Sequence, residues 1–306
     1  MEFRTPVIID KSPFAIDPCE RMLFVGSCFA DNIGSRFVDD KFRATVNPYG
    51  VMYNPASILH TVERYLAAET AEVARTAVFT LGTNRVYILN ETGEIVDNCQ
   101  KRPQRLFTER SLSVDECAAY LREAIAQLRN RRPDVRVILT VSPIRYAKYG
   151  FHGSAVSKAT LLLAADEVAR QTDACVYFPA YEIVCDELRD YRFYAPDMLH
   201  PSQQAVEYIW ERFADTFFSS KTKAFMSEWL PIKAALNHRP FNPDSAEHRA
   251  FIEKTQQRVA TLKAHYPELD FSAIQCPLPG AAAQRLIYCP QSRQRKKRCI
   301  LRGYFY

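Results

Sequence analysis

The sequence predicts an α/β protein with a mostly parallel sheet, helices on both faces, and a helical region appended near the C-terminal end. Two observations lead to this fold class. Over the first 218 residues, short apolar runs that end in glycine or polar turns alternate with segments of helical periodicity, which is the pattern of βαβ units. After Phe218 the strand pattern stops and helical segments follow. We therefore expect a main domain over 1–218, a helical extension over 219–275 and a basic, poorly ordered tail over 276–306.

The strands of the predicted sheet are short, apolar and rich in β-branched or aromatic residues. Two further runs flank the turn Asn90–Gly93 and predict a hairpin. Three of the apolar runs end in turns that contain glycine or serine, so polar side chains follow them. The ranges expected as strands are 22–25, 77–81, 135–141 and 175–178, with the hairpin over 86–89 and 94–96.

Helices are predicted from apolar spacing and from capping residues. Phe29, Ile33 and Phe37 fall four residues apart and mark one face of a helix that begins near Cys28. Ser113 and Glu116 form a capping box before the next helix. The remaining helices are expected over 157–171, from 178 to about 188, from Pro201 as first residue, and over 221–237 and 244–266.

The composition excludes several classes of protein. The chain has 306 residues, 47% of them hydrophobic, and its nine cysteines include no C-x-x-C pair, which argues against a disulfide framework and against a zinc site. No apolar run reaches about 18 residues, and the N-terminus lacks the pattern of a signal peptide. We expect a cytoplasmic protein with no cofactor, no metal and no membrane span.

The basic run 293–298 is the main charged feature of a chain whose net charge is +5. Such runs contact nucleic acid or anionic lipid in some proteins and are solvated surface in most. No aromatic residues interleave this run. We favour a solvated tail over nucleic-acid or lipid contact. Nothing in the sequence specifies an oligomeric state.

Polar turns at the ends of three predicted strands indicate where a site would form. The turns are Gly26-Ser27-Cys28, Gly82-Thr83-Asn84 and 142–145, and ligands of open parallel sheets bind at the carboxyl ends of the strands. Asp197 and His200 are three residues apart, which lets the carboxylate reach the imidazole Nδ1. A nucleophile at a strand-to-helix turn, a histidine and a carboxylate are the components of acyl-transfer chemistry.

These turns belong to a set of strings that resembles the GSCFA family, a branch of the SGNH/GDSL hydrolase superfamily. The resemblance extends over roughly residues 1–218. It implies a flavodoxin-like three-layer α/β/α sandwich and an acyl-hydrolase machinery, and it gives no substrate. The strings that carry it are LFVGSCFADNIG, NPYGVMYNPASI, TLGTNRVY, NCQKRPQRLF, TVSPIR and YFPAYEIVCDELRDYRFYAPDMLHPS.

The nucleophile remains a choice between two neighbours. In strict register with the Gly-Asp-Ser turn of the superfamily, Cys28 takes the position of the catalytic serine and Ser27 that of the aspartate. A cysteine at a helix N-terminus near a histidine is a competent nucleophile and would form a thioester. In the alternative, Ser27 is a hydroxyl nucleophile and Cys28 is a packed thiol. We favour Cys28.

The other superfamily blocks are assigned by resemblance. The second block supplies a backbone N–H to the oxyanion hole, and Gly50 is its candidate. The third supplies an asparagine side chain, for which Asn84 is the candidate, although Arg85 replaces the aspartate that follows in the superfamily. Asn84 can also simply hold its turn. The fourth block is Asp197 with His200.

Ser142 and Arg145 are candidate substrate-binding residues because they follow a predicted strand. Arg145 can clamp a carboxylate or phosphate of a substrate, or it can pair with Asp186 or Asp190. The leading hypothesis is an esterase or acyltransferase that acts on a small-molecule or glycan ester. The alternative is a carbohydrate- or protein-binding module on a degenerate hydrolase scaffold.

Overall fold

The chain divides into two compact units. The structure is a computed structural model and describes residues 4–68, 72–173, 175–238, 240–242, 244–269, 271, 274–275 and 287–288. The first unit takes the chain up to Ala15, then Arg21–Gly34 and Ala44–Phe217. The second takes Ile16–Glu20, Ser35–Arg43 and the chain from Phe218 onward.

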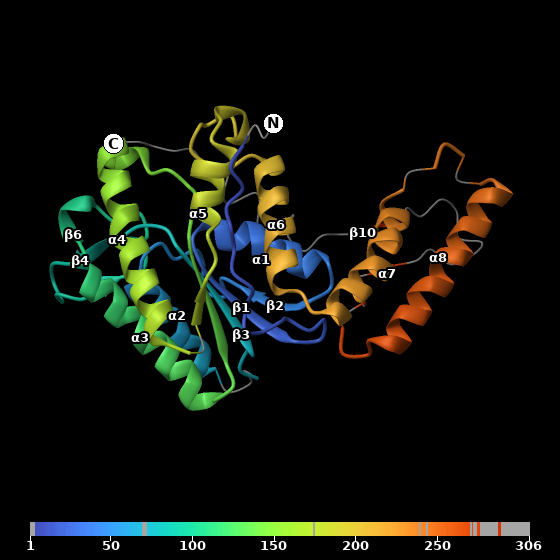
Figure 1. The fold of residues 1–306 in the computed structure, drawn as a ribbon, viewed down its shortest axis with the longest axis horizontal. Coiled ribbons are helices and arrows are strands. Elements are labelled where there is room, and N and C mark those ends of the chain that lie inside the picture. Colours follow the sequence, from blue (N-terminus) through green and yellow to red (C-terminus); the bar gives the residue numbers. More distant parts are fainter. Residues whose placement is uncertain are drawn as a thin grey trace. The chain divides into compact units, whose positions relative to one another are not determined.

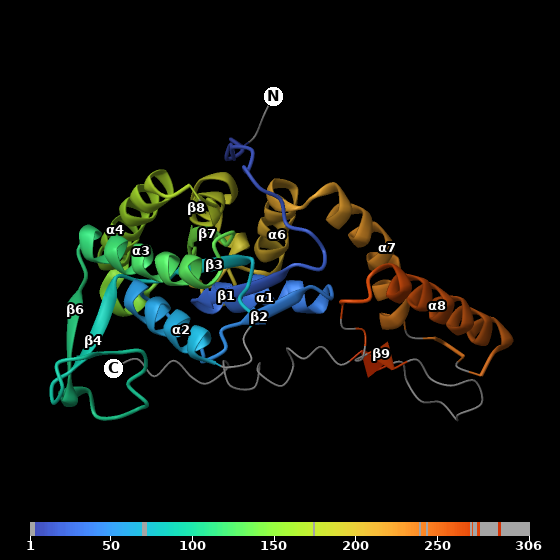
Figure 2. The same ribbon diagram turned by 90° about the horizontal axis from the view of Figure 1, so that it is seen from below.

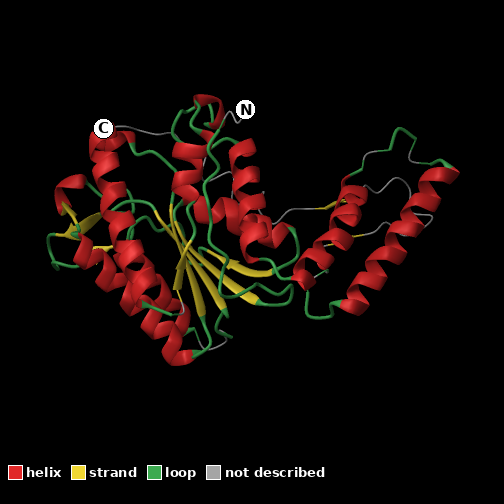
Figure 3. Ribbon diagram, viewed as in Figure 1, coloured by secondary structure: helices red, strands yellow, loops and turns green. Residues whose placement is uncertain are grey.

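A five-stranded sheet is the centre of the first unit (Figure 3). The pairs β1–β3, β3–β7 and β7–β8 are parallel. In chain order the sheet reads 2-1-3-4-5, which is the flavodoxin-like arrangement, and the predicted fold class is confirmed. The strands lie in the order β2 (Arg43–Val46), β1 (Arg21–Gly26), β3 (Thr76–Leu81), β7 (Arg136–Val141) and β8 (Cys175–Tyr177).

Helices cover both faces of this sheet (Figure 1). On β1, Leu23 and Val25 belong to the core formed with α2, α3 and α4, whereas the buried Phe24 between them points to the opposite face. Because apolar residues occupy both faces of the strand, it reads as one continuous hydrophobic run in the sequence. One layer holds α2 (Pro55–Ala67), α3 (Val114–Arg131) and α4 (Gly150–Gln171), and the other holds α1 (Cys28–Asp39), α5 (Ala180–Glu182) and α6 (Gln203–Phe217).

A separate three-stranded antiparallel sheet follows β3, and Figure 2 shows its strands beside the ends of α3 and α4. The predicted hairpin is confirmed as β4 (Arg85–Leu89) paired with β5 (Ile95–Val96). The strand β6 (Phe107–Ser111) was not predicted, and it pairs with the other edge of β4 after a 3₁₀ turn at Gln104–Leu106. Only Phe107 of β6 is buried, so the strand lacks the apolar alternation that would predict it.

Two elements of the main sheet layer were missed in the sequence. The strand β2 has no buried residue among its four, and therefore carries no apolar pattern. The helix α2 begins after Asn54, whose side chain accepts a hydrogen bond from the Ser57 N–H, with Pro55 at the first position. This is a standard helix start. The helix was not predicted because an Asn-Pro pair is also typical of a turn.

Two predicted helix starts are wrong. The helix α4 begins at Gly150 rather than 157. The helix after β8 ends at Leu188 as predicted, with α5 continuing as a π-helical turn over Ile183–Leu188. Pro201 does not open the last helix, because it pairs across a β-bridge with Tyr194. The helix α6 starts at Gln203, and Ser202 accepts the Ala205 N–H. Short 3₁₀ turns occupy Ala147–Tyr149 and Tyr191–Phe193.

The second unit is built on two helices, α7 (Ser220–Asn237) and α8 (Ala246–His265), which confirms the two helices predicted there. Two short strands, β9 (Ile274–Gln275) and β10 (Ile287–Tyr288), pair with each other. Most of the predicted basic tail lies outside the described residues. Among the helices that the structure does describe, none is long and apolar enough to cross a membrane.

Earlier segments of the chain complete the core of this second unit. Phe42 contacts Phe37, Phe218 and Phe225 through ring-to-ring packing. The buried carboxylate of Asp40 accepts hydrogen bonds from the Trp229 indole and from Lys233, and it pairs with Arg36. The residues 35–43 are therefore an integral part of the C-terminal helical unit.

Candidate functional site

The turn between β1 and α1 is fixed by close backbone packing. Gly26 has φ +147°, and a Cβ there would lie 2.2 Å from the carbonyl oxygen of Thr80, so only glycine fits. The Ser27 N–H donates to the carbonyl oxygen (3.1 Å) and to Oγ1 (3.0 Å) of Thr80. The Gly26 N–H donates to Asn47 Oδ1 at 2.9 Å, and Asn47 Nδ2 in turn donates to Asp31. These bonds hold the carboxyl ends of β1 and β3 in register.

Ser27 and Cys28 occupy different environments in this turn. The Ser27 side chain is fully buried, and its Oγ accepts the Phe29 N–H at 3.2 Å and lies 3.2 Å from Thr80 Oγ1. Ser27 is thus the N-cap of α1. Cys28 is partly exposed, and its Sγ lies 3.8 Å from Tyr53 Oη. Of the two side chains, Cys28 is therefore the more accessible.

Asp197 and His200 form a closely bonded pair. His200 Nδ1 lies 2.6 Å from Asp197 Oδ2, while Asp197 Oδ1 accepts the N–H groups of Leu199 and His200. Partial burial disfavours the ionised carboxyl, but these hydrogen bonds outweigh it and lower the pKa of Asp197 below its ordinary value. An ionised Asp197 fixes the proton on Nδ1 and leaves Nε2 as the basic nitrogen.

The loop that carries this pair is fastened to the segment after β7. The Arg145 N–H donates to the Leu199 carbonyl at 3.0 Å, and its Nη1 donates to the Met198 carbonyl at 3.1 Å. The loop closes on itself through the bridge between Tyr194 and Pro201. Met198 has φ +58°, so the turn between Asp197 and His200 is tight. These contacts place the Asp–His pair among the loops at the carboxyl end of the sheet.

The Arg145 guanidinium lies among aromatic rings. Its Cζ is 4.1 Å from the Phe151 ring centroid, 5.5 Å from that of Tyr194 and 5.8 Å from that of Tyr191. The two acidic residues considered as its partners contact other arginines, since Asp186 lies 3.9 Å from Arg189 and Asp190 lies 3.7 Å from Arg192.

The two predicted oxyanion donors, Gly50 and Asn84, already donate hydrogen bonds within the protein. The Gly50 N–H donates to the Asn47 carbonyl at 2.9 Å. Asn84 Nδ2 donates to the Leu112 carbonyl at 2.7 Å, and the Asn84 N–H donates to Ser157 Oγ at 2.9 Å. The Gly50 N–H has a single hydrogen and must leave the Asn47 carbonyl before it can stabilise an oxyanion. The Asn84 amide has two hydrogens, and the Leu112 carbonyl accepts one of them.

Ser142 is fully buried, so its predicted contact with substrate would need the loop to move. Its Oγ accepts the Ile144 N–H at 3.4 Å, and its carbonyl accepts a hydrogen bond from Lys158 Nζ at 2.7 Å. The same Nζ donates to the Gly82 carbonyl at 2.7 Å. Lys158 therefore joins the turns that follow β3 and β7.

Lys158, Tyr53 and Tyr146 also lie beside the turns at the carboxyl end of the sheet, and none of them was predicted there. Each lies in a segment whose pattern predicts a helix or a loop, and nothing in its spacing indicates a site. Tyr53 could have been noticed because it stands inside the string NPYGVMYNPASI that carries the resemblance. A lysine within a predicted amphipathic helix normally faces solvent, whereas Lys158 is buried.

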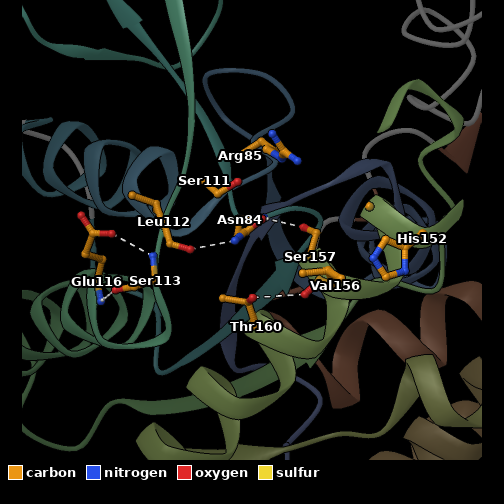
Figure 4. A pocket seen from close by; sticks show the side chains of 11 residues that line it. Asn84, Arg85, Ser111, Leu112, Ser113, Glu116, His152, Val156, Ser157 and Thr160 are labelled. Atoms are coloured by element: carbon orange, nitrogen blue, oxygen red, sulfur yellow. Dashed lines mark hydrogen bonds between the residues drawn. The ribbon is translucent and has the colours of Figure 1, made fainter. Parts of the chain in front are cut away.

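A pocket of about 520 Å³ lies beside this region (Figure 4). Several of its polar groups are bonded to one another, as Asn84 is to Ser157 and Glu116 is to Ser113. His152 lies in the first turn of α4 and faces this pocket. Neither Cys28 nor His200 lines it. The residues that line it are Asn84, Arg85, Ser111, Leu112, Ser113, Glu116, His152, Gly153, Val156, Ser157 and Thr160.

Metal coordination has no candidate in the described part of the chain, where no group of three or more His, Cys, Asp or Glu side chains is gathered. The chemistry available from the residues described is that of a thiol, an imidazole, carboxylates and hydroxyls.

The fold and the strand-end turns define an α/β protein of flavodoxin-like topology with an Asp–His pair on its loop layer. The chain belongs to the GSCFA family, whose model matches residues 21–76 and 66–213. The model of the GSCFA domain protein, C-terminal domain, matches residues 229–275. The resemblance found in the sequence is thereby confirmed. Among curated proteins, no relative matches the chain.

Solved structures similar to this chain include esterases. An acetylxylan esterase from Geobacillus stearothermophilus is 15% identical, with 67% of this chain and 98% of that chain covered at a TM-score of 0.44. A carbohydrate esterase of family 3 from Talaromyces cellulolyticus is 12% identical, with coverages of 64% and 95% and a TM-score of 0.38. A protein from Lactobacillus plantarum is 13% identical, with coverages of 67% and 100% and a TM-score of 0.41.

Proposed function

We propose that this protein is an acyl hydrolase or acyltransferase that acts on esters, with Cys28 as nucleophile, His200 as general base and Asp197 as the residue that orients the imidazole. The observation that carries the proposal is the 2.6 Å contact between His200 Nδ1 and Asp197 Oδ2. It fixes the tautomer in which Nε2 accepts a proton. The loop bearing this pair is bonded to the segment after β7. Both β7 and β1 have their carboxyl ends at this edge of the sheet, and β1 ends at Gly26, two residues before Cys28.

In the proposed reaction, His200 Nε2 takes the thiol proton and the sulfur electron pair forms a bond to the ester carbonyl carbon. The carbonyl π electrons move onto oxygen, and their return breaks the C–O bond to the alkoxy group, which leaves as an alcohol with the proton from His200. A water, or the hydroxyl of an acceptor, then attacks the thioester while His200 takes its proton. The carboxylic acid or the new ester leaves, and the protonated thiol is restored.

The N-terminus of α1 supports the choice of sulfur over oxygen. Cys28 is the first residue of a helix of 12 residues, where the helix dipole favours a thiolate. Ser27 uses its hydroxyl as the cap of the same helix and is fully buried. If Ser27 were the nucleophile, its attack would remove the cap and require the turn to open.

The surface beside the catalytic loop supports a substrate with a sugar-like or similarly flat part. Phe151 and Tyr191 are 56% and 65% exposed next to Arg145. Exposed aromatic rings beside a guanidinium offer stacking faces and hydrogen-bond donors. This combination suits a small-molecule or glycan ester, which extends the proposal to substrate class.

The test is turnover of p-nitrophenyl acetate and of an acetylated-sugar panel by wild type and three variants. We expect Cys28→Ala and His200→Ala to lose activity by at least about 10³-fold, as for other nucleophile–base pairs. Ser27→Ala should keep the reaction, with stability lowered by about 1 kcal/mol for the lost cap. Unchanged turnover in His200→Ala would contradict the proposal, and loss of turnover only in Ser27→Ala would move the nucleophile to oxygen.

A non-catalytic binding module is the second candidate, because the N–H of Gly50 donates to the Asn47 carbonyl and the side-chain amide of Asn84 donates to the Leu112 carbonyl. The two candidates differ in the reactivity of Cys28. A catalytic Cys28 should react with iodoacetamide faster than the other thiols and with a pH midpoint below that of an ordinary thiol. Slow labelling of Cys28 combined with no turnover on any ester would favour the binding module.

A further inference from the structure

We propose that the Tyr146 hydroxyl is the side-chain hydrogen-bond donor that stabilises the oxyanion at this site, and that Lys158 is the positioning residue that holds it. The inference rests on the proposed function, because an oxyanion forms only if Cys28 attacks a carbonyl. It assigns to Tyr146 the task that resemblance gives to Asn84.

Gly82 shows where the Tyr146 hydroxyl points. A Cβ built on Gly82 would lie 2.5 Å from Tyr146 Oη and 3.4 Å from the Ser27 Cβ. The hydroxyl therefore occupies the space that a side chain at position 82 would fill, at the carboxyl end of β3 and facing the turn at the end of β1. The absence of a side chain on Gly82 is what admits the hydroxyl to this position.

Tyr53 lies between the Tyr146 ring and the proposed nucleophile, and it contacts both. The Tyr146 ring packs edge-on against the Tyr53 ring at 6.1 Å between centroids, and Tyr53 Oη lies 3.8 Å from Cys28 Sγ. The negative charge of an ionised Cys28 raises the pKa of Tyr146. Tyr146 and Cys28 are thus near enough to interact electrostatically through a buried region of the site.

Tyr146 Oη is buried, and within the described part of the chain it has no hydrogen-bond partner. As for the buried Ser142, a substrate oxygen reaches this hydroxyl only when the side chains that cover it move. A buried hydroxyl without a partner costs stability, on the order of 1–3 kcal/mol, and such groups in folded proteins call for a functional explanation. Desolvation by burial raises the pKa of Tyr146 well above its ordinary value, and the neighbouring Tyr53, Cys28 and Tyr149 raise it further. Tyr146 therefore keeps its proton and remains a donor at neutral pH.

Several contacts fix the position of Tyr146. Its N–H donates to Ser154 Oγ at 3.2 Å, and Lys158 Nζ lies 5.1 Å from the centroid of its ring. Lys158 also donates to the carbonyls of Gly82 and Ser142. Lys158 therefore links Gly82, which faces the Tyr146 hydroxyl, to Ser142, which precedes Tyr146 in the chain. These bonds restrain the position of Tyr146, and an oxyanion donor must be held in a fixed position.

The decisive variant is Tyr146→Phe. Its matched control is Tyr149→Phe, at the last residue of the 3₁₀ turn that follows Tyr146. Tyr149 carries the same hydroxyl, which interacts with Tyr87 and Glu109 instead. We expect Tyr146→Phe to lower kcat by about 10²–10³-fold with little change in KM, which is the effect of removing one oxyanion donor. Tyr149→Phe should keep the turnover of wild type.

Two further measurements separate this role from others. Alkylation by iodoacetamide forms no oxyanion, so Cys28 in Tyr146→Phe should react at the wild-type rate with the wild-type pH midpoint. The melting temperature should stay equal or rise, because an unpaired buried hydroxyl is removed. Lys158→Met should lower kcat as well, while Cys28 alkylation stays unchanged, because its effect acts through the position of Tyr146.

The inference is overturned if Tyr146→Phe keeps kcat within about twofold of wild type, if its alkylation midpoint moves together with the lost turnover, or if it fails to fold. The first of these results leaves the proposed function intact when Cys28→Ala and His200→Ala are still inactive. If wild type turns over no ester at all, the proposed function fails, and the role of Tyr146 fails with it.

Discussion

At the scale of single residues, the site depends on neighbours of similar chemistry that have different tasks. Ser27 caps α1 and is buried, whereas Cys28, the next residue, is partly exposed. The difference arises because consecutive residues at the start of a helix project their side chains in different directions. In the same way Tyr146 has a buried hydroxyl without a partner among the described residues, whereas Tyr149 interacts with Tyr87.

Lys158 makes a residue-scale prediction about pH. Desolvation lowers its pKa from 10.5 to about 7, with the Cys185 thiol opposing the shift, and a neutral amine still has two N–H donors for the Gly82 and Ser142 carbonyls. Between these two pH values the unfolded chain holds a proton that the folded chain lacks, so the free energy of unfolding of wild type rises with pH. The slope from this group approaches about 1.4 kcal/mol per pH unit.

In Lys158→Met this contribution is absent. We therefore expect the free energy of unfolding of wild type, minus that of the variant, to increase as the pH is raised from about 7 to 9. Urea denaturation at several pH values measures this difference directly. Parallel curves for the two proteins across this range would show that Lys158 keeps its proton in the folded state.

Sequence reasoning identified part of the site at this scale, and physical causes explain its limits. The spacing of Asp197 and His200 predicts their pairing, whereas Cys28 was chosen over Ser27 from the register of its string with the superfamily turn. Tyr146 and Lys158 act through contacts with Gly82, which is distant in the chain, and no local pattern encodes such contacts. Gly50 and Asn84 were predicted as oxyanion donors. Only the structure shows that the Gly50 N–H donates to the Asn47 carbonyl and that the Asn84 amide donates to the Leu112 carbonyl.

At the scale of elements, the site consists of turns that a parallel sheet gathers at one edge. The turns after β1, β3 and β7 are joined by bonds of Thr80 to Ser27 and of Lys158 to Gly82 and Ser142. The loop with the Asp–His pair is the one component that does not follow a central strand directly. Arg145 connects it to β7 through two hydrogen bonds.

Arg145→Ala should therefore loosen the catalytic loop. We expect kcat to fall by about 10- to 100-fold, the effect of a small misplacement of a catalytic group, while the alkylation rate of Cys28 changes little. Arg145→Lys should restore little activity, because an ammonium group lacks the planar stacking of a guanidinium. Steady-state kinetics with Arg170→Ala as a surface control measures this effect.

The same experiment tests the prediction that Arg145 clamps an anionic group of the substrate. In that case KM for an anionic ester would rise in Arg145→Ala, whereas kcat and the kinetics of a neutral ester would stay at the wild-type values. That result would contradict the positioning role derived from the Met198 and Leu199 contacts.

At the scale of the whole molecule, the two compact units are interleaved in sequence. The residues 16–20 and 35–43 belong to the C-terminal unit, although the sequence predicts them as part of a main domain over 1–218. The helix periodicity of α1 was visible because Phe29, Ile33 and Phe37 share one face. Nothing local indicates that Phe37 packs on Phe218, so a domain boundary drawn from composition alone does not show this division of the chain.

Asp40 provides the test of this partition. Its side chain is fully buried and accepts hydrogen bonds from Trp229 and Lys233. Removing one partner of a buried ion pair typically costs about 3–5 kcal/mol, so Asp40→Ala should lower the melting temperature markedly. The exposed Asp10→Ala serves as control and should melt as wild type does. Equal melting of both variants would show that residues 35–43 contribute little to the C-terminal unit.

The central claim is that Cys28 attacks an ester carbonyl, and the most direct measurement is the site of acylation. The protein is mixed with p-nitrophenyl acetate, quenched in acid within the first turnovers, digested and analysed by mass spectrometry. The account predicts one acetyl group on the peptide that contains Cys28, attached through a thioester that hydroxylamine removes, and none in Cys28→Ala. An acetyl group on Ser27, or wild type that turns over the ester without acylating Cys28, would contradict it.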